Sequence, residues 1–406
     1  MIILLSKGYE SDEDLNMLEI WNSIFDQEPV GLGAEHTAYE IFQQPGLWRK
    51  VYEIILQRKR ELSEFFNGML TSNTQVIFTG AGTSAFIGSS LEGIFHNNQN
   101  VFVRAIPTTS IVTHPEYYFH KDKPTLLISF ARSGDSPESL ATVMLANQLC
   151  ENIHHLIITC NKNGQLALNA DKTRDLVLIL PPESNDKGLA MTGSYTSMLL
   201  TAILLSKLEN INSLDKHIDS LCGYGSTLLD RYSGKIKEIC ELQIERAVFL
   251  GSGSLLGVAE ECHLKLQELT DGQVISKYHS FLGFRHGPKA VINSNTLIVY
   301  LFSPDPYVYQ YEDDLVHAVN TGERGMASIG VFEKSHPGLN FDVEISLSPT
   351  NKEPIDSDFL PVCYVLVGQL LGLFKSLQLG LKPDNPSASG AITRVVQGVK
   401  IYPFKQ

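Results

Sequence analysis

The chain of 406 residues is 43% hydrophobic and long enough for two globular domains of ordinary size. Its formal net charge of −13, without any basic run, argues against a nucleic-acid surface, which needs clustered lysine and arginine. The six cysteines form no CxxC pair, the N-terminus lacks the features of a signal peptide, and the longest apolar stretches are too short or interrupted to span a membrane. We therefore expect a cytoplasmic protein with reduced thiols that acts away from nucleic acid and membranes.

The N-terminal segment, up to about residue 50, has helical patterns and no strand-like run. Acidic patches such as SDEDLNMLEIWNSIF predict a helical extension over residues 1–50. The segment GLWRKVYEIILQRKRELSEFFNGML follows, with apolar residues at helical spacing. It predicts one long amphipathic helix that leads into a first domain, which we place at residues 51–212.

Strands and helices alternate from Gln75 onward. The strand-like segments are QVIFT, VFVRA, TLLISF, HHLIITC and DLVLIL, and helix-sized segments or loops separate them. This alternation is typical of a parallel sheet with helices on both faces. Because ligands bind at the carboxyl ends of the strands in such sheets, the turns after QVIFT and TLLISF are candidate binding sites.

The turn Ser133-Gly134-Asp135-Ser136 between strand and helix is the stronger of the two candidates. Gly134 allows a close approach of the backbone, Ser133 and Ser136 supply hydroxyl groups, and the free N–H groups of the next helix point toward an anion. We predict a phosphate ligand, although such a segment is also an ordinary helix N-cap. The Gly-Ala-Gly turn resembles a dinucleotide-binding turn, but no acidic residue ends the following strand, so we expect no nicotinamide cofactor.

The second half repeats the first. RAVFLGSGSLLGVAEECHLKLQEL parallels QVIFTGAGTSAFIGSSLEGIF, which indicates an internal duplication. TLIVYLFSPDP stands where TLLISFARSGDSP stood, so the second phosphate turn is lost and one anion site per chain remains. We expect a second α/β domain over residues 213–380, with further strands in MASIGVFEK and FDVEISL, and a C-terminal tail over residues 381–406 that closes the active site.

Candidate catalytic residues lie in this second half. Glu261, Lys265 and Glu268 follow one another at i, i+4 and i+7 and therefore share one helix face. Such a face is either an acid–base cluster or a solvated stripe of salt bridges. His286 belongs to the glycine-flanked loop FLGFRHGPK, where a histidine is either functional or simply solvated. No metal site is expected, because the sequence lacks HExxH and His154-His155 has no third ligand.

Five motifs together carry a resemblance to a known family. GAGTS, SFARSGDSPES, ESNDKGLAMTGSYTS, GSGSLLGVAEECHLKLQE and FRHGPKAVI resemble the tandem sugar isomerase (SIS) domain family, which includes the isomerase half of glutamine–fructose-6-phosphate aminotransferase. FLGFRHGPK and the tail PDNPSASGAITRVVQGVKIYP are more similar to the AgaS-type galactosamine-6-phosphate deaminase/isomerases, also described as tagatose-6-phosphate ketose/aldose isomerases. The resemblance covers residues 40–406 and implies two flavodoxin-like three-layer domains, each with a five-stranded parallel sheet.

The resemblance also implies roles for individual residues. The substrate phosphate would be bound by the two glycine turns, through Thr83, Ser84, Ser133, Gly134 and Ser136. The acid–base residues would be Glu261, Lys265, Glu268 and His286. In the aminotransferase the histidine enters from the neighbouring subunit, which implies a homodimer or a larger homo-oligomer here. Gln397 stands where the aminotransferase has an imine-forming lysine, so that chemistry is in doubt, and no cofactor is expected.

The activity that the resemblance implies is deaminating isomerisation of an aldosamine 6-phosphate. The favoured substrate is D-galactosamine 6-phosphate, which would give D-tagatose 6-phosphate and ammonia. The N-terminus begins with Met1 and Ile2 instead of a nucleophilic cysteine, so a glutamine-dependent synthesis is not expected. Two alternatives stay open: a simple ketose/aldose isomerase of a sugar phosphate, and a sugar-phosphate sensor.

Overall fold

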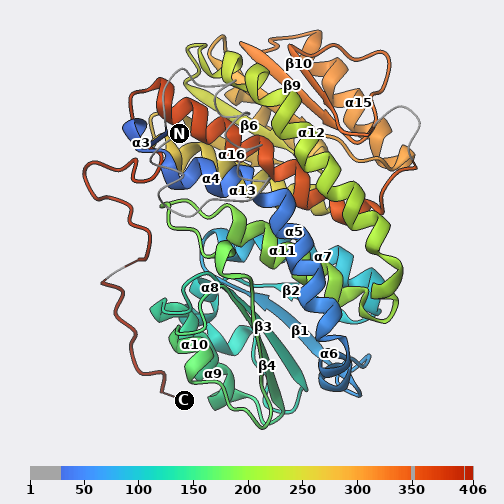
Figure 1. Ribbon diagram of the computed structural model, residues 1–406, viewed down its shortest axis with the longest axis vertical. Helices are drawn as coiled ribbons and strands as arrows, with labels where there is room; N and C mark the ends of the chain where they lie inside the picture. The colour runs from blue at the N-terminus through green and yellow to red at the C-terminus, as the bar shows by residue number, and fades with distance from the viewer. Residues whose placement is uncertain (1–28, 349–352, 397, 406) are drawn as a thin grey trace, which may run out of the picture.

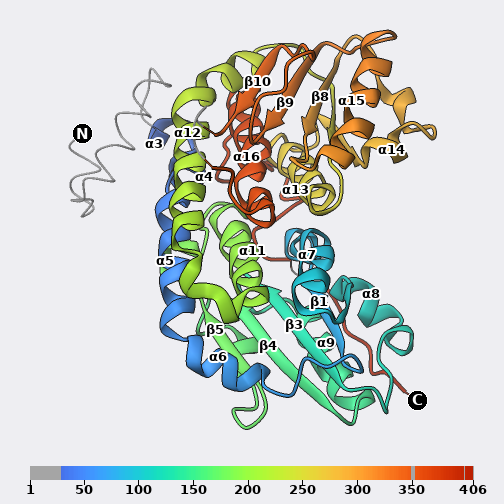
Figure 2. The same cartoon turned by 90° about the vertical axis from the view of Figure 1, so that its right-hand side faces the viewer.

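The structure is a computed structural model that describes residues 29–348, 353–396 and 398–405. Most of the predicted N-terminal extension, and Gln397, lie outside the described residues. Two parallel sheets lie one above the other, with a layer of helices between them (Figures 1 and 2). The sequence-based prediction of an α/β fold with two duplicated domains and five-stranded parallel sheets is therefore confirmed.

The first sheet has the strand order β2-β1-β3-β4-β5, and every pair is parallel. Its central strands are buried along their whole length, which explains why their sequences are continuous apolar runs. The strands are β1 (Gln75–Thr79), β2 (Phe102–Ala105), β3 (Thr125–Ala131), β4 (Ile153–Thr159) and β5 (Leu176–Ile179).

The second sheet repeats this arrangement with the order β10-β9-β8-β6-β7, again all parallel. Its edge strand β7 was not predicted as a strand, because ISKYH mixes exposed and half-buried positions and has no apolar run. The strands are β6 (Arg246–Leu250), β7 (Ile275–His279), β8 (Thr296–Leu301), β9 (Ala327–Phe332) and β10 (Val343–Ser346).

The helices and short 3₁₀ turns connect the strands and cover both sheets. The α-helices are α3 (Pro29–Leu32), α4 (Glu35–Phe42), α5 (Gln44–Gln57), α6 (Lys59–Phe66), α7 (Thr83–Gln99), α8 (Thr108–Thr113), α9 (Pro137–Leu149), α10 (Gln165–Leu168), α11 (Gly193–Ser206), α12 (Asp215–Cys240), α13 (Ser254–Leu269), α14 (Phe281–Phe284), α15 (Pro306–Asn320) and α16 (Leu360–Gln378). The 3₁₀ turns are η1 (Pro115–Tyr117), η2 (Pro182–Ser184), η3 (Leu208–Ser213), η4 (Pro288–Val291) and η5 (Ser357–Phe359).

The segment predicted as one long amphipathic helix forms two helices, α5 and α6, because the helical conformation is interrupted at Arg58. There the Arg58 guanidinium donates to the carbonyl of Val177 at 3.2 Å and pairs with Glu61 at 2.8 Å. Helix α5 and the 26-residue helix α12 run side by side along both halves of the molecule (Figure 2). The two halves are thus held together by a shared outer layer of helices.

Helices α7, α11, α13 and α16 form the layer between the two sheets (Figure 2). Glycines allow α13 to approach α7 and α16 closely. A Cβ on Gly257 of α13 would lie 2.4 Å from the backbone nitrogen of Ser90 in α7, and a Cβ on Gly368 of α16 would lie 2.6 Å from Cys262 in α13. Residues 357–378 are long and apolar enough for a membrane span, but nearly all of this segment is buried. The expectation that the longest apolar stretches are too short or interrupted to span a membrane is therefore wrong for this segment by length and composition, but its burial makes α16 a core helix.

Candidate active site

Both glycine turns lie at the carboxyl end of the first sheet, after the neighbouring strands β1 and β3. Each turn depends on a left-handed glycine, Gly82 at φ +55° and Gly134 at φ +73°. In the first turn, a Cβ on Gly80 would lie 2.6 Å from the backbone carbon of Ser84. The two turns therefore bring Ser84 and Ser133 to one edge of the sheet, where a ligand of such folds binds.

The Ser133–Ser136 turn is held in shape by its own hydroxyl groups and by the loop after β4. Ser136 caps α9, since its hydroxyl oxygen accepts from the Ser139 backbone N–H at 3.4 Å. Asn161 donates to the Ser133 carbonyl at 2.9 Å, and a Cβ on Gly164 would lie 2.3 Å from that same oxygen. Ser136 is thus the helix N-cap that the sequence also allowed. This cap and the contact from Asn161 hold the turn in one conformation.

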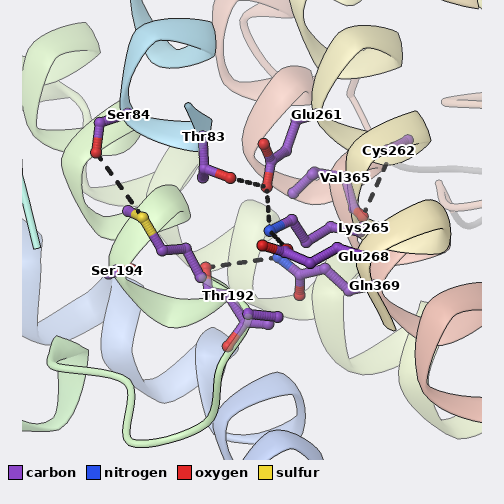
Figure 3. A network of polar contacts seen from close by, with 12 residues as sticks. Thr83, Ser84, Thr192, Ser194, Glu261, Cys262, Lys265, Glu268, Val365 and Gln369 are labelled. Carbon is purple, nitrogen blue, oxygen red and sulfur yellow. Dashed lines mark hydrogen bonds and ion pairs between the residues drawn. The ribbon is translucent and has the colours of Figure 1, made fainter. Parts of the chain in front are cut away.

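The three predicted acid–base residues of α13 form one connected chain of contacts (Figure 3). The Lys265 ammonium lies 2.6 Å from Glu268 Oε2 and 3.4 Å from Glu261 Oε1. The side chains of Lys265 and Glu261 are fully buried, whereas that of Glu268 is 21% exposed. The face is therefore no solvated stripe, and of the three residues only Glu268 is open to a ligand.

The charges of this cluster can be assigned from burial and distance. Burial raises the pKa of Glu261 to about 8; the charge of Lys265 acts against this shift, and the smaller effect of the Glu268 charge adds to it. The two carboxylates also raise the pKa of Lys265, against the effect of its burial. One ammonium can neutralise one carboxylate, and the shorter contact is to Glu268. At neutral pH we therefore assign the proton to Glu261.

Thr83, the first residue of α7, contacts this cluster from the first half of the chain. Its hydroxyl donates to Glu261 Oε1 at 3.4 Å, although the two residues are 178 positions apart in sequence. Its neighbour Ser84 donates to the sulfur of Met191 at 3.8 Å (Figure 3). Thr83 was predicted as a phosphate ligand, and here its hydroxyl is directed at Glu261. The N-terminus of α7 thus connects the glycine turn with α13.

His286 is not brought to this cluster within the chain. It lies exposed in the loop between α14 and η4, and its backbone N–H donates to the Gly283 carbonyl at 3.1 Å. Within the described residues, its ring has no contact with Glu268 or Lys265. The histidine is thus on a surface that another chain can reach.

The loop between η2 and α11 lies beside these turns and is firmly held. Asp186 is fully buried and accepts from the backbone N–H groups of Thr192, Gly193 and Ser194 at 2.8 to 3.0 Å, so it caps α11. Glu40 of α4 accepts from the backbone N–H groups of Lys187 and Gly188. Burial, together with the charge of Asp186, raises the pKa of Glu40 to about 9. This carboxyl is therefore protonated at neutral pH.

Arg132 and Arg394 were not among the predicted site residues. Arg132 follows β3, and its guanidinium donates to carbonyls of the loop and to the Arg394 carbonyl at 2.6 Å. Arg394 donates to the Asp186 carbonyl at 2.9 Å. The sequence could have indicated Arg132, since this arginine directly precedes Ser133. It contained no signal for the contact with Arg394, 262 positions away.

The described residues contain no group of three or more histidine, cysteine or acidic side chains placed to hold a metal ion. All six cysteines are free thiols. The chemistry available at the candidate site is therefore that of one partly exposed carboxylate, Glu268, beside a buried lysine, which is connected through Glu261 to Thr83 at the first glycine turn.

Comparisons with known proteins agree on one family. A family model described as the SIS domain matches residues 69–206. The D-galactosamine-6-phosphate deaminase AgaS of Shewanella sp. (strain ANA-3) is 39% identical over 97% of this chain and 97% of its own length. The crystal structure of tagatose-6-phosphate ketose/aldose isomerase from Escherichia coli superposes with a TM-score of 0.83 at 34% identity, covering 91% of this chain and 97% of that one.

A further crystal structure, of a Clostridium novyi NT protein proposed to be a tagatose-6-phosphate ketose/aldose isomerase, has a TM-score of 0.88. It is 42% identical and covers 91% of this chain and 95% of that one. These relatives are matched almost end to end, by sequence and by fold. The chain belongs to the SIS-domain family of AgaS galactosamine-6-phosphate deaminases and tagatose-6-phosphate isomerases.

Proposed function

We propose that the protein converts D-galactosamine 6-phosphate to D-tagatose 6-phosphate and ammonia. The observation that carries this proposal is the Lys265–Glu268 ion pair, which is joined through Glu261 and Thr83 to the glycine turn of the first half. These contacts connect a partly exposed carboxylate with a turn that would bind phosphate, which supports the proposal. A protein that only sensed a sugar phosphate would have no need of this acid–base pair.

The phosphate group of the substrate would occupy the edge formed by Ser84, Ser133, Gly134 and Ser136. The three serine hydroxyl groups and the N-terminus of α9 favour an anion there. Phosphate is remote from the reacting carbons, so its binding energy serves to position C1 and C2 against Glu268.

Glu268 would be the catalytic residue that moves the proton. After the sugar ring opens, its carboxylate takes the proton from C2, which leaves an enolamine, and returns a proton to C1. The product is the C2 imine of the ketose, and water hydrolyses it to the ketose and ammonia. Lys265 and Glu261 are fully buried, so they are assigned as positioning residues that act through Glu268.

His286 would open the sugar ring from a neighbouring subunit, since it is exposed here and has no contact with the acid–base cluster of its own chain. This requires a homodimer or a larger homo-oligomer. A mixture of Glu268→Gln and His286→Asn variants tests it, because dissociation and reassociation would create one intact site per mixed dimer. Recovery of about a quarter of the wild-type activity is expected for random pairing, and no recovery would place the histidine in its own site or outside catalysis.

The reaction is assigned to the cytoplasm, in keeping with the six free thiols. The decisive experiment is ammonia release from galactosamine 6-phosphate, with glucosamine 6-phosphate in parallel. Ammonia together with tagatose 6-phosphate supports the proposal, and the ratio of the two rates gives the preference at C4. Exchange of ketose and aldose phosphates without ammonia would instead make the protein a simple isomerase that uses the same proton shuttle.

A further inference from the structure

Arg132 is a buried cation that the proposed mechanism does not use. It lies where strand β3, the loop before α11 and the C-terminal segment meet. It stands between strand β3 and Ser133 and is only 7% exposed. Burial of a guanidinium is costly unless its donors are satisfied. The position of this residue, next to the first hydroxyl of the phosphate turn, therefore calls for an explanation.

The partners of Arg132 in the described part of the chain are all main-chain carbonyls. Its Nη1 donates to the carbonyls of Gly188, Leu189 and Ala190 at 3.4, 3.2 and 3.4 Å. Its Nη2 donates to the Arg394 carbonyl at 2.6 Å. The rigid fork of the guanidinium thus joins the loop before α11 to the C-terminal segment, a geometry that lysine does not offer.

The C-terminal segment 384–396, here named the strap, has no helix or strand of its own. It begins at Asp384, which caps α4 by accepting from the Thr37 backbone N–H at 2.7 Å. Near its other end Arg394 donates to Asp186 and Asn185 in the loop, while Val396 is 57% exposed. Apart from the buried residues Pro386 and Ser387, the strap is therefore held by a few polar contacts, and Arg132 supplies one of them.

The charge of Arg132 is compensated only at longer range. Burial lowers its pKa, and so does the charge of Arg394 on the strap, while the carboxylates of Asp186 and Glu268 raise it. Asp186 already accepts from the N-terminus of α11. An anion bound beside Ser133 would add a negative charge close to the guanidinium, and this favours the arrangement in which Arg132 stays in place.

We propose that Arg132 is a positioning residue that couples occupation of the Ser133–Ser136 turn to docking of the strap on the loop. The inference rests on the proposed function for the identity of the anion, a phosphate. Binding of phosphate stabilises the docked strap, and by linkage the docked strap strengthens phosphate binding. The substrate would thereby help to close its own site.

Hydrogen–deuterium exchange of peptides 185–191 and 384–396, with and without inorganic phosphate, tests the coupling. In the wild type, saturating phosphate should slow exchange of the strap roughly tenfold. In Arg132→Gln both peptides should exchange faster without ligand, and phosphate should no longer slow the strap. Arg132→Lys should show a weakened response, because it keeps the charge and loses the fork. If Arg132→Gln does not fold, a full wild-type response in Arg132→Lys overturns the proposal.

Arg60→Gln is the matched control, since Arg60 is an exposed arginine paired with Glu64 on α6, and its exchange pattern should equal that of the wild type. An intact response to phosphate in Arg132→Gln overturns the inference. Titration calorimetry with phosphate separates the two proposals: binding without any effect on the strap overturns the coupling alone, whereas no binding overturns the coupling together with the proposed phosphate site. In that case the exchange rates of the wild type and Arg132→Gln without phosphate still show whether Arg132 holds the loop.

Discussion

The two halves of the chain share one backbone plan and differ in the chemistry that they display. Their sheets have equivalent strand orders, and the glycines before α7 and α13 have nearly the same conformation: Gly82 at φ +55°, ψ −129° and Gly253 at φ +56°, ψ −126°. Alignment of these glycines pairs the two helices residue by residue. The pairs of first-half and second-half residues are Ser84 with Leu255, Ser90 with Glu261, Ile94 with Lys265, and Asn97 with Glu268.

The second strand-end turn is different as well. In the first half, no acidic side chain of the described residues accepts from the Ser133–Ser136 turn. In the second half, buried Glu312 accepts from the Ser303 backbone N–H at 2.9 Å, and Asp305 caps α15 by accepting from Tyr307 at 2.8 Å. The protein's own carboxylates thus take up donors in the second copy. Under the proposed function, the duplication has left an edge for the substrate phosphate in one half and a helix with the acid–base residues in the other.

The largest effect is expected at the acid–base helix, from Glu268→Gln. The amide cannot accept the C2 proton, so turnover should fall by about 10²–10⁴-fold while binding of the sugar phosphate stays close to normal. Steady-state kinetics and titration calorimetry measure the two quantities. The matched control is Glu260→Gln on the same helix, where Glu260 accepts from the Tyr278 hydroxyl instead of from Lys265, and its turnover should stay near the wild-type value. Equal losses in both variants would contradict the assignment of Glu268.

The comparison of the two strand-end turns predicts an asymmetry between equivalent serines. Ser133→Ala should raise KM for the phosphorylated substrate about tenfold and leave kcat nearly unchanged, because a lost hydrogen bond to a charged group weakens remote binding. Ser303→Ala removes the equivalent hydroxyl in the second half, which accepts from Asp305 at 3.2 Å, and should leave KM unchanged. A rise in KM for both serines would place an anion in each half.

The sequence was sufficient to predict features that depend on residues close together in the chain, such as the central strands and the shared face of one helix. Continuous apolar runs indicated the central strands, and the spacing of Glu261, Lys265 and Glu268 predicted that they share one face. The contacts of Lys265 with Glu268 and Glu261 on that face are present, at 2.6 and 3.4 Å. Their burial was not predictable, because it depends on close packing of α13 against α7 and α16, which glycines such as Gly257 permit.

Contacts between distant segments also escaped prediction. Arg132 meets the Arg394 carbonyl across 262 positions, and Thr83 meets Glu261 across 178. No periodicity or motif encodes such a pair, since tertiary packing alone brings the segments together. The loop before α11 is likewise fixed by contacts from distant residues, namely Glu40, Arg132 and Arg394.

A smaller effect is expected from Glu312, the carboxylate at the second turn. Burial raises its pKa from 4.5 to about 7, so the folded state keeps its proton between these values while the unfolded state has lost it. This group's contribution to stability is therefore present at low pH and is lost as pH rises toward 7, by at most about 3 kcal/mol. Denaturant unfolding at pH 5 and pH 7.5 should show a smaller pH-dependent loss in Glu312→Gln than in the wild type.

The control for this measurement is Glu323→Gln, which removes an exposed carboxylate just after α15 and should leave the pH dependence as in the wild type. If Glu312→Gln and the wild type lose stability in parallel between pH 5 and pH 7.5, the carboxylate at the second turn is already ionised throughout this range.

The smallest effect at neutral pH is expected from Glu261→Gln. Because the pKa of Glu261 is raised to about 8, its protonated form prevails at pH 7 and a glutamine resembles it closely. Turnover at pH 7 should stay within about threefold of the wild type. Above pH 8 the wild-type carboxylate ionises and competes with Glu268 for the Lys265 ammonium, so activity should fall on the alkaline side in the wild type and be retained longer in the variant. A pH–rate profile measures both. A large loss at pH 7 would mean instead that the catalytic helix requires both carboxylates in their charged form, and that the proton lies elsewhere in the cluster.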